Sequence, residues 1–115
     1  MNKLNKYYNY RGNKCKLVCQ GLYHNNQWAL ELLDENGSVQ TRITVCVDED
    51  LKENEIAIKD YSENDGMWIW LVDNDLIEDV YYEIPAGYAI IKVSKLNDEL
   101  YKDLMEVRDD NNWID

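Results

Sequence analysis

The chain has 115 residues, of which 45% are hydrophobic and 30% are charged, and its formal net charge is −11. This length suits one domain with a single hydrophobic core, and the apolar content excludes a globally disordered chain. Residues 1–30 carry five bases and no acid, whereas residues 31–115 carry 23 acids against the remaining seven bases, a net charge of −16. Such a body would repel nucleic-acid phosphates, so we expect it not to bind nucleic acid directly.

The polar N-terminus, rich in Asn and Tyr, predicts a flexible basic arm over residues 1–13, followed by a single domain over residues 14–115. The arm interleaves bases with tyrosines, as binders of single-stranded nucleic acid do. Because no folded groove accompanies these residues, pairing of the arm with the protein's own acidic surface is the simpler interpretation.

Three strands are predicted next, because apolar and polar residues alternate over residues 15–22, 28–32 and 38–47. In the first strand, Cys15, Leu17 and Cys19 share one face. The turn sequences His24-Asn25-Asn26 and Asp34-Glu35-Asn36-Gly37 separate the strands. Short turns join antiparallel neighbours, so the pattern predicts an N-terminal three-stranded meander.

The second half of the chain predicts two helices and further strands. Residues 48–55 are too acidic for a core and predict a solvated loop before a short strand over residues 56–58. The sequence Ser62-x-x-Asp65 resembles a capping box and predicts a helix over about 64–76, with Trp68, Leu71 and Val72 in the core.

A hairpin or loop around Pro85-Ala86-Gly87 and a last strand follow, and then leucines at helical spacing predict a helix over about 97–108, with a fraying tail at residues 109–112. Together these elements predict an α+β fold with a mainly antiparallel sheet, the meander plus C-terminal strands, and two helices.

No motif indicates catalysis, a cofactor or a metal. Cys15, Cys19 and Cys46 are odd in number and lack metal-ligand spacing, so we interpret them as buried hydrophobic residues rather than as zinc ligands with His24. Calcium-loop spacing fails from both Asp60 and Asp73. The sequence therefore predicts a protein that is not an enzyme.

Two further features bear on localisation. No apolar run reaches the roughly 18 residues of a membrane-spanning helix, and the N-terminus has no apolar stretch suited to a secretory signal. Free thiols are normal in the cytoplasm, and we therefore expect a cytoplasmic protein.

Residues of about 22–95 carry an order of segments that resembles a family of small acidic proteins of unknown function, found in bacteriophages, plasmids and conjugative elements. The matching segments are Leu22-Tyr23-x4-Trp28-Ala29-Leu30-Glu31-Leu32, Asp34-Glu35-x-Gly37, Thr41-Arg42-Ile43-Thr44-Val45, Asn54-Glu55-Ile56-Ala57-Ile58-Lys59-Asp60, Leu71-x2-Asn74-x-Leu76 and Gly87-Tyr88. Most of these positions are core and turn residues. The resemblance implies a fold and an origin in a mobile genetic element, and it implies no catalytic residue.

The charge and the resemblance together favour an acidic binding protein that engages a basic protein surface. Small acidic proteins of mobile elements are plausible anti-defence inhibitors, acting as DNA mimics or as anti-CRISPR inhibitors of a nucleic-acid-binding host protein. The predicted contact residues fall in two clusters: Asp48, Glu49, Asp50, Glu53 and Glu55, then Asp73, Asp75, Glu78 and Asp79.

The alternative is an accessory protein–protein interaction domain or a homodimer whose acidity serves only solubility. Aromatic residues would then form the interface, because they dominate binding energy where acids do not. The candidates are Trp70, Tyr81, Tyr82 and Trp113. The sequence leaves open whether the protein is a monomer or a homodimer.

Overall fold

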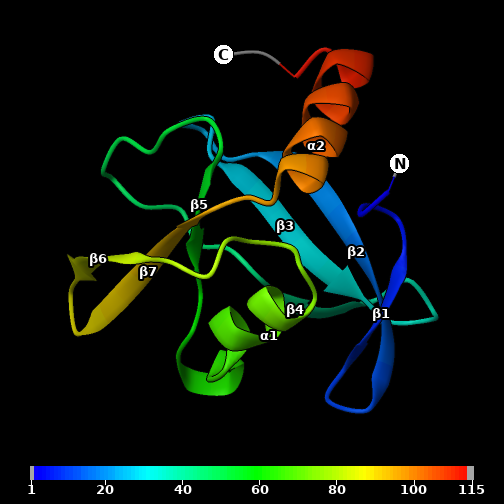
Figure 1. The fold of residues 1–115 in the computed structure, drawn as a ribbon, viewed down its shortest axis with the longest axis horizontal. Helices are drawn as coiled ribbons and strands as arrows, with labels where there is room; N and C mark the ends of the chain where they lie inside the picture. Colours follow the sequence, from blue (N-terminus) through cyan, green and yellow to red (C-terminus); the bar gives the residue numbers. More distant parts are fainter. Residues whose placement is uncertain (1, 114–115) are drawn as a thin grey trace.

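The computed structural model describes residues 2–113, and in this part of the chain it has two α-helices and seven strands in antiparallel sheets, which confirms the α+β fold (Figure 1). The strands are β1 (Tyr7–Tyr10), β2 (Asn13–Leu22), β3 (Trp28–Leu33), β4 (Val39–Arg42), β5 (Glu55–Ile58), β6 (Tyr82–Ala86) and β7 (Ala89–Lys95). The helices are a 3₁₀ turn, η1 (Ser62–Asn64), then α1 (Met67–Asp73) and α2 (Asp98–Asn111).

The first sheet has the strand order β1-β2-β3-β4 and contains the predicted meander as β2 to β4. The turn between β3 and β4 follows the chemistry of its sequence. Asp34 Oδ1 accepts hydrogen bonds from the N–H groups of Asn36 and Ser38, and Gly37 takes a positive φ of 84°. The short connection thereby fixes β3 and β4 as antiparallel neighbours.

The N-terminus is part of this sheet. β1 pairs with β2 along its length, and Leu4 and Tyr10 are only 2% and 3% exposed. The buried Asp103 of α2 accepts hydrogen bonds through Oδ2 from the N–H groups of Asn2, Lys3 and Leu4. The prediction of a flexible arm is therefore wrong for the described residues 2–13, because the anchoring carboxylate lies about a hundred positions away in the sequence.

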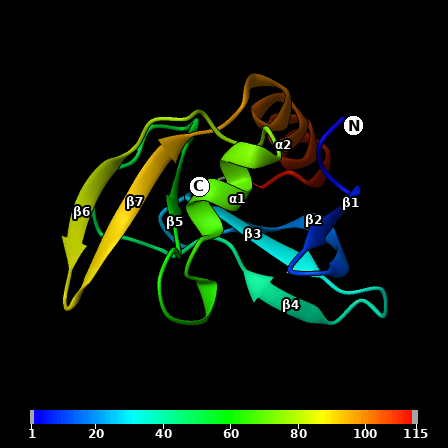
Figure 2. The ribbon, with the colours of Figure 1, turned by 60° about the horizontal axis from the view of Figure 1, so that its bottom comes forward.

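The second sheet has the order β5-β7-β6, and residues 43–45 connect it to the first. Ile43 N–H donates to Leu30 O of β3, whereas Val45 N–H donates to Ala57 O of β5. The predicted strand over residues 38–47 is thus divided: β4 pairs with β3, and Thr44 then bridges to Ile58. The two sheets form a curved layer around α1 (Figure 2).

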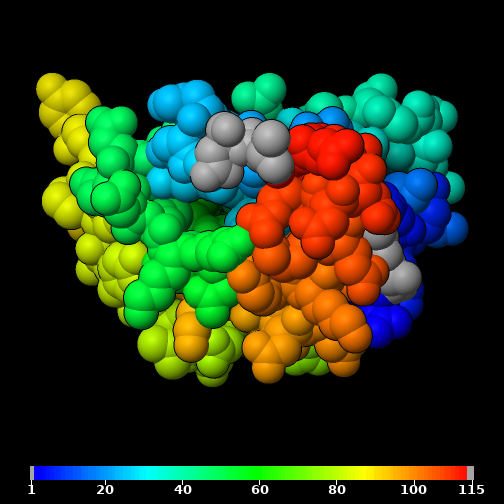
Figure 3. Space-filling view, turned by 90° about the horizontal axis from the view of Figure 1, so that it is seen from above, coloured from blue at the N-terminus to red at the C-terminus, as the bar shows by residue number. Residues whose placement is uncertain are grey.

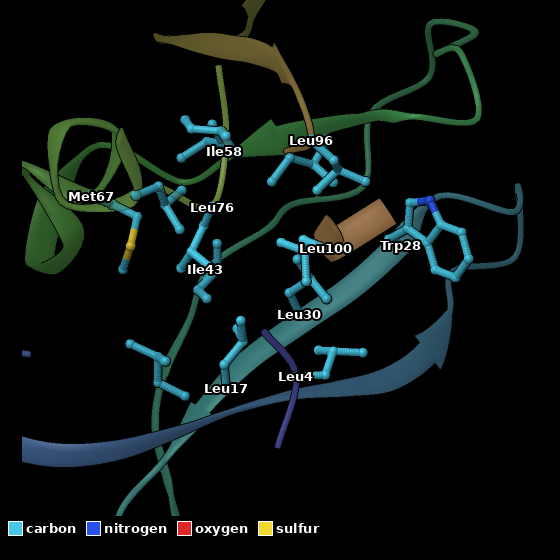
Figure 4. Packing of buried hydrophobic residues seen from close by; sticks show 14 of the residues in the cluster. Leu4, Leu17, Trp28, Leu30, Ile43, Ile58, Met67, Leu76, Leu96 and Leu100 are labelled. Atoms are coloured by element: carbon cyan, nitrogen blue, oxygen red, sulfur yellow. The ribbon is translucent and has the colours of Figure 1, made fainter. Parts of the chain in front are cut away.

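The main core fills the concave side of this layer. Leu17 and Leu30 of the first sheet, Ile58 of the second sheet, Met67 of α1 and Leu100 of α2 all belong to one buried cluster (Figure 4). Burial of these side chains is the main source of stability, at roughly 1.5–3 kcal/mol for each.

Both helices form where the sequence predicts them, with shifted ends. Residues Ser62–Asn64 form η1, and α1 begins after Gly66, whose φ is 95°, so the predicted capping box is wrong. Asp60 Oδ1 instead accepts the N–H groups of Gly66 and Trp68. In the helix, Met67 and Leu71 are the buried residues, while Trp68 and Val72 are only partly buried.

The Asn97 side chain caps α2 by accepting from the N–H groups of Glu99 and Leu100. The helix continues through Asn111, so the predicted fraying at residues 109–112 is wrong for residues 109–111.

The hairpin of β6 and β7 closes through Gly87 and Tyr88, with Ala86 opposite Ala89. The predicted turn at Pro85-Ala86-Gly87 is therefore displaced, because Pro85 lies in β6. This strand is at the edge of its sheet, where proline is tolerated since its missing N–H faces solvent.

Candidate functional site

The acidic loop before β5 lies beside α2 (Figure 3). Asp48, Glu49 and Asp50 are exposed, as predicted. Glu53 ties the loop to α2 and to β3, because its Oε1 accepts a hydrogen bond from Arg108 Nη1 at 2.5 Å and its carbonyl oxygen accepts one from Trp28 Nε1 of β3 at 2.7 Å. The Arg108 guanidinium also lies 5.8 Å from the centre of the Trp28 ring.

The solvent side of α2 is itself acidic. Leu100, Asp103 and Leu104 face the core, and the exposed stripe of the helix carries five carboxylates and one lysine. These residues are Asp98, Glu99, Lys102, Glu106, Asp109 and Asp110. They were not predicted as contact residues, although leucines at helical spacing already imply that the residues between them face solvent.

The second predicted acidic cluster partly meets the first turn of α2. Ile77 bridges to Leu96, and Glu78 N–H donates to Lys95 O at 2.9 Å. Because this pairing holds residues 76–78 against residues 95–97, the exposed Asp75, Glu78 and Asp79 lie near the start of the helix. Asp73 is exposed at the end of α1, and no hydrogen bond or ion pair among the described residues joins its side chain to α2.

We define the acidic face as the exposed carboxylates of these three segments: Asp48, Glu49, Asp50, Glu53, Asp75, Glu78, Asp79, Asp98, Glu99, Glu106, Asp109 and Asp110. Among the described residues, only Glu53, Glu78 and Asp109 of this face have a cation within 4.0 Å. Most of its charge is therefore uncompensated, and it sets up a negative field over one side of the molecule.

The N-terminal bases do not neutralise the acidic face. None of Lys3, Lys6, Arg11, Lys14 and Lys16 forms a salt bridge with a carboxylate of the described chain. Arg11 donates to the backbone oxygens of Glu63 and Asp65, and Lys14 Nζ lies 4.7 Å from the centre of the Tyr7 ring. Among the described residues 2–113, the arm therefore forms no ion pair with the protein's own acids.

Glu55 does not belong to the acidic face. Its residue is only 8% exposed, and its Oε1 accepts hydrogen bonds from Lys52 N–H at 2.8 Å and from the Tyr82 hydroxyl at 3.2 Å. Glu55 is thus buried rather than on the open surface, because β5 turns this side chain inward at the end of the acidic loop.

The predicted aromatic interface is only partly exposed. Trp70 packs on β1, with its Nε1 donating to Asn9 O at 2.8 Å and its ring edge-to-face with Tyr10 at 5.3 Å. Trp113 is partly buried after the end of α2. Tyr81 and Tyr82 are 41% and 46% exposed. Of the four predicted residues, these two tyrosines alone are well exposed in the described chain.

The structure adds three exposed apolar residues near these tyrosines in the sequence. Val80, Tyr88 and Ile90 are strongly exposed, with Val80 before β6 and the other two at the hairpin. A signal for Ile90 was present, because Ile90 and Ile91 are neighbours in one strand and neighbours point to opposite faces. Ile91 is buried, so Ile90 faces outward.

The cysteines differ in exposure: Cys15 is buried, Cys19 is partly buried and Cys46 is exposed. The prediction of three buried thiols is wrong for Cys46, because the predicted strand ends before it. Burial raises the pKa of the Cys19 thiol to about 11.

Among residues 2–113, no group of three or more His, Cys, Asp or Glu side chains is arranged to hold a metal ion. No helix in this part of the chain has the length and apolarity needed to cross a membrane.

Comparison with known proteins adds no relative. No protein-family model, curated protein or solved structure matches the chain. The resemblance to small acidic proteins of mobile elements therefore stays a prediction.

Proposed function

We propose that this chain is a non-enzymatic binding protein whose acidic face engages a basic protein surface, of the kind that binds nucleic acid. The observation that supports this proposal is the alignment of uncompensated carboxylates on α2, with the acidic loop beside the helix and residues 75–79 near its start. Inhibition of a defence nuclease by DNA mimicry would be one instance of this activity.

The helix gives the acidic face a defined shape. The 14 residues of α2 extend over about 20 Å at a rise of 1.5 Å per residue. Leu100 and Leu104 are buried in the main core, which fixes the direction in which the opposite carboxylates point. A rigid row of anions can stand in for a stretch of phosphate backbone, whereas acids on a mobile tail would lose more entropy on binding.

Electrostatic attraction of this kind predicts fast and salt-sensitive association. Exposed charges are screened beyond about 8 Å at physiological ionic strength, so affinity for a basic partner should fall steeply as salt is added. The test is binding of the full chain to an immobilised basic DNA-binding protein between 50 and 300 mM NaCl, with duplex DNA as competitor.

Two matched double variants separate the acidic face from net charge. Glu106→Lys with Asp110→Lys reverses two charges on α2, whereas Glu35→Lys with Glu83→Lys reverses two exposed charges outside the acidic face. We expect at least a tenfold loss of affinity for the first pair and less than twofold for the second. Equal losses in both pairs, or an affinity indifferent to salt, would contradict the proposal.

A second candidate function, self-association or an accessory interaction domain, is favoured by the exposed Val80, Tyr88 and Ile90. Monomeric proteins do expose single apolar residues, so this observation is weaker than the acidic face. A homodimer would make the sedimentation coefficient rise with protein concentration at any ionic strength.

A further inference from the structure

A hollow of about 280 Å³ lies where the chain enters β6. Ile77 pairs with Leu96 and Tyr82 pairs with Val93, so the four residues 78–81 stand opposite only Lys95 and Ser94. The extra residues bulge outward, and the Ser94 hydroxyl holds the bulge by donating to Val80 O at 2.8 Å. Bulges of this kind often redirect side chains next to binding sites.

The walls of the hollow are mainly apolar. Val80, Tyr81, Tyr82 and Val93 line it, and Val80 is 73% exposed. The Tyr81 ring is held in place by an edge-to-face contact with Trp68, with the ring centres 5.0 Å apart. Pockets for drug-sized ligands have volumes of about 300–1,000 Å³, so this hollow suits a single side chain rather than a larger molecule.

A buried carboxylate borders the same hollow. Glu55 uses Oε1 for both of its hydrogen bonds, and Oε2 accepts none from the described residues. An ionised carboxylate can accept about four hydrogen bonds, so one oxygen of Glu55 keeps its capacity for a donor. Glu78 and Lys95 complete the charged lining, which sums to −1.

We propose that this hollow binds the guanidinium group of an arginine side chain on a protein partner. The aliphatic stem of arginine matches the valine walls, and its planar head can stack on a tyrosine ring and donate to Glu55. The inference deepens the proposed function, on which it rests for the basic character of the partner, by adding a specific anchor next to Glu78 of the acidic face.

Among the residues that line the hollow, Lys95 is the one cation that competes for this position. Its side chain is 54% exposed, and its Nζ lies 3.9 Å from Glu78 Oε2, at the outer limit of an ion pair. Exposed pairs of this length contribute little, so an arriving guanidinium can displace the ammonium. Removing Lys95 should therefore strengthen binding, an effect that misfolding could not mimic.

The test is a titration of the ¹⁵N-labelled full chain at 150 mM NaCl with acetyl-Gly-Arg-Gly-amide, followed by ¹H–¹⁵N NMR. The control peptide carries citrulline, which has nearly the same shape as arginine but no charge. We expect the arginine peptide to shift the amide signals of residues 55, 78–82 and 93–95, with the citrulline peptide at least tenfold weaker.

Three variants locate the site. Glu55→Gln should weaken the arginine peptide about tenfold, whereas Glu83→Gln removes the same charge from an exposed position outside the hollow and should change affinity less than twofold. Lys95→Ala should strengthen binding about threefold. Thermal melts of each variant show whether it folds, and the Lys95→Ala result tests the proposal even where Glu55→Gln does not fold.

Several results would overturn the inference. They are shifts on α2 instead of at the hollow, equal binding of the citrulline peptide, or signals of the hollow that move with protein concentration alone, which would assign it to a second copy of the chain. The charge-reversal variants of α2 should leave the peptide site intact, so failure of the arginine site and failure of the acidic face are separate outcomes.

Discussion

Asp103 joins α2 to residues 2–4, and its removal is the sharpest test of the fold. The carboxylate accepts three backbone N–H groups through Oδ2, from Asn2 at 3.0 Å, Lys3 at 2.7 Å and Leu4 at 3.2 Å. Asn2 is exposed and Lys3 is partly exposed, so their amides can turn to water, whereas Leu4 is buried. Asp103→Ala should therefore leave the Leu4 N–H unsatisfied at a cost of about 2 kcal/mol, while the amides of Asn2 and Lys3 exchange the carboxylate for water at little cost.

Two smaller effects adjust this figure. Looser packing of Leu4 in the core increases the loss of stability by about 1 kcal/mol. The better helix propensity of alanine at position 103 reduces the loss by about 0.5 kcal/mol. We expect a net loss of about 2–3 kcal/mol, which corresponds to about 10 °C in melting temperature for a domain of this size.

Urea unfolding followed by tryptophan fluorescence at pH 7 measures this loss. Glu106→Ala, three positions along α2 on the exposed side, is the matched control and should stay within about 0.5 kcal/mol of the parent chain. Asp103→Asn keeps an acceptor oxygen and should lose only about 1 kcal/mol. If Asp103→Ala were as stable as the control, the N-terminus would not be held as the structure indicates.

Two further predictions concern the thiols. At pH 8, Cys46 should react with a disulfide reagent in the folded protein, whereas Cys15 and Cys19 should react only after the protein unfolds. With a pKa of about 11, Cys19 is only about 0.1% thiolate at this pH. Equal reactivity of all three thiols would contradict this. The folded pKa of Cys19 is raised from 9.0 to about 11, so the unfolded chain loses this proton first as pH rises. The free energy of unfolding should therefore keep the whole contribution of Cys19 below pH 9 and fall by roughly 2–3 kcal/mol as pH rises to 11. Urea titrations of Cys19→Ala should show a smaller fall.

The sequence predicted most of the acidic residues of the candidate site, but it did not predict which acids belong to the acidic face. The acids of the loop and of residues 73–79 were predicted from their density, and all of them except Glu55 are exposed. Density alone could not distinguish Glu55, which accepts the Tyr82 hydroxyl across the second sheet, from its exposed neighbours. The density of acids also did not single out the carboxylates of α2, which form one face with the acidic loop only in the folded protein.

Local patterns were sufficient to predict several of the helices and strands. The alternation of apolar and polar residues predicts β2 and β3, and the Asn36-Gly37 sequence predicts the turn between β3 and β4. The spacing of Leu100 and Leu104 predicts the buried side of α2. Such signals are local, because the spacing of apolar residues already fixes which side of an element must be covered.

Only the tertiary structure decided which distant groups meet. Asp103 anchors the N-terminus, Trp70 covers β1 and residues 43–45 pass from one sheet to the other. Each of these features depends on a hydrogen-bond partner that lies 12 to 101 positions away in the chain. The sequence shows that a side chain can be buried or charged, but the free energy of burial depends on the group that it finally contacts.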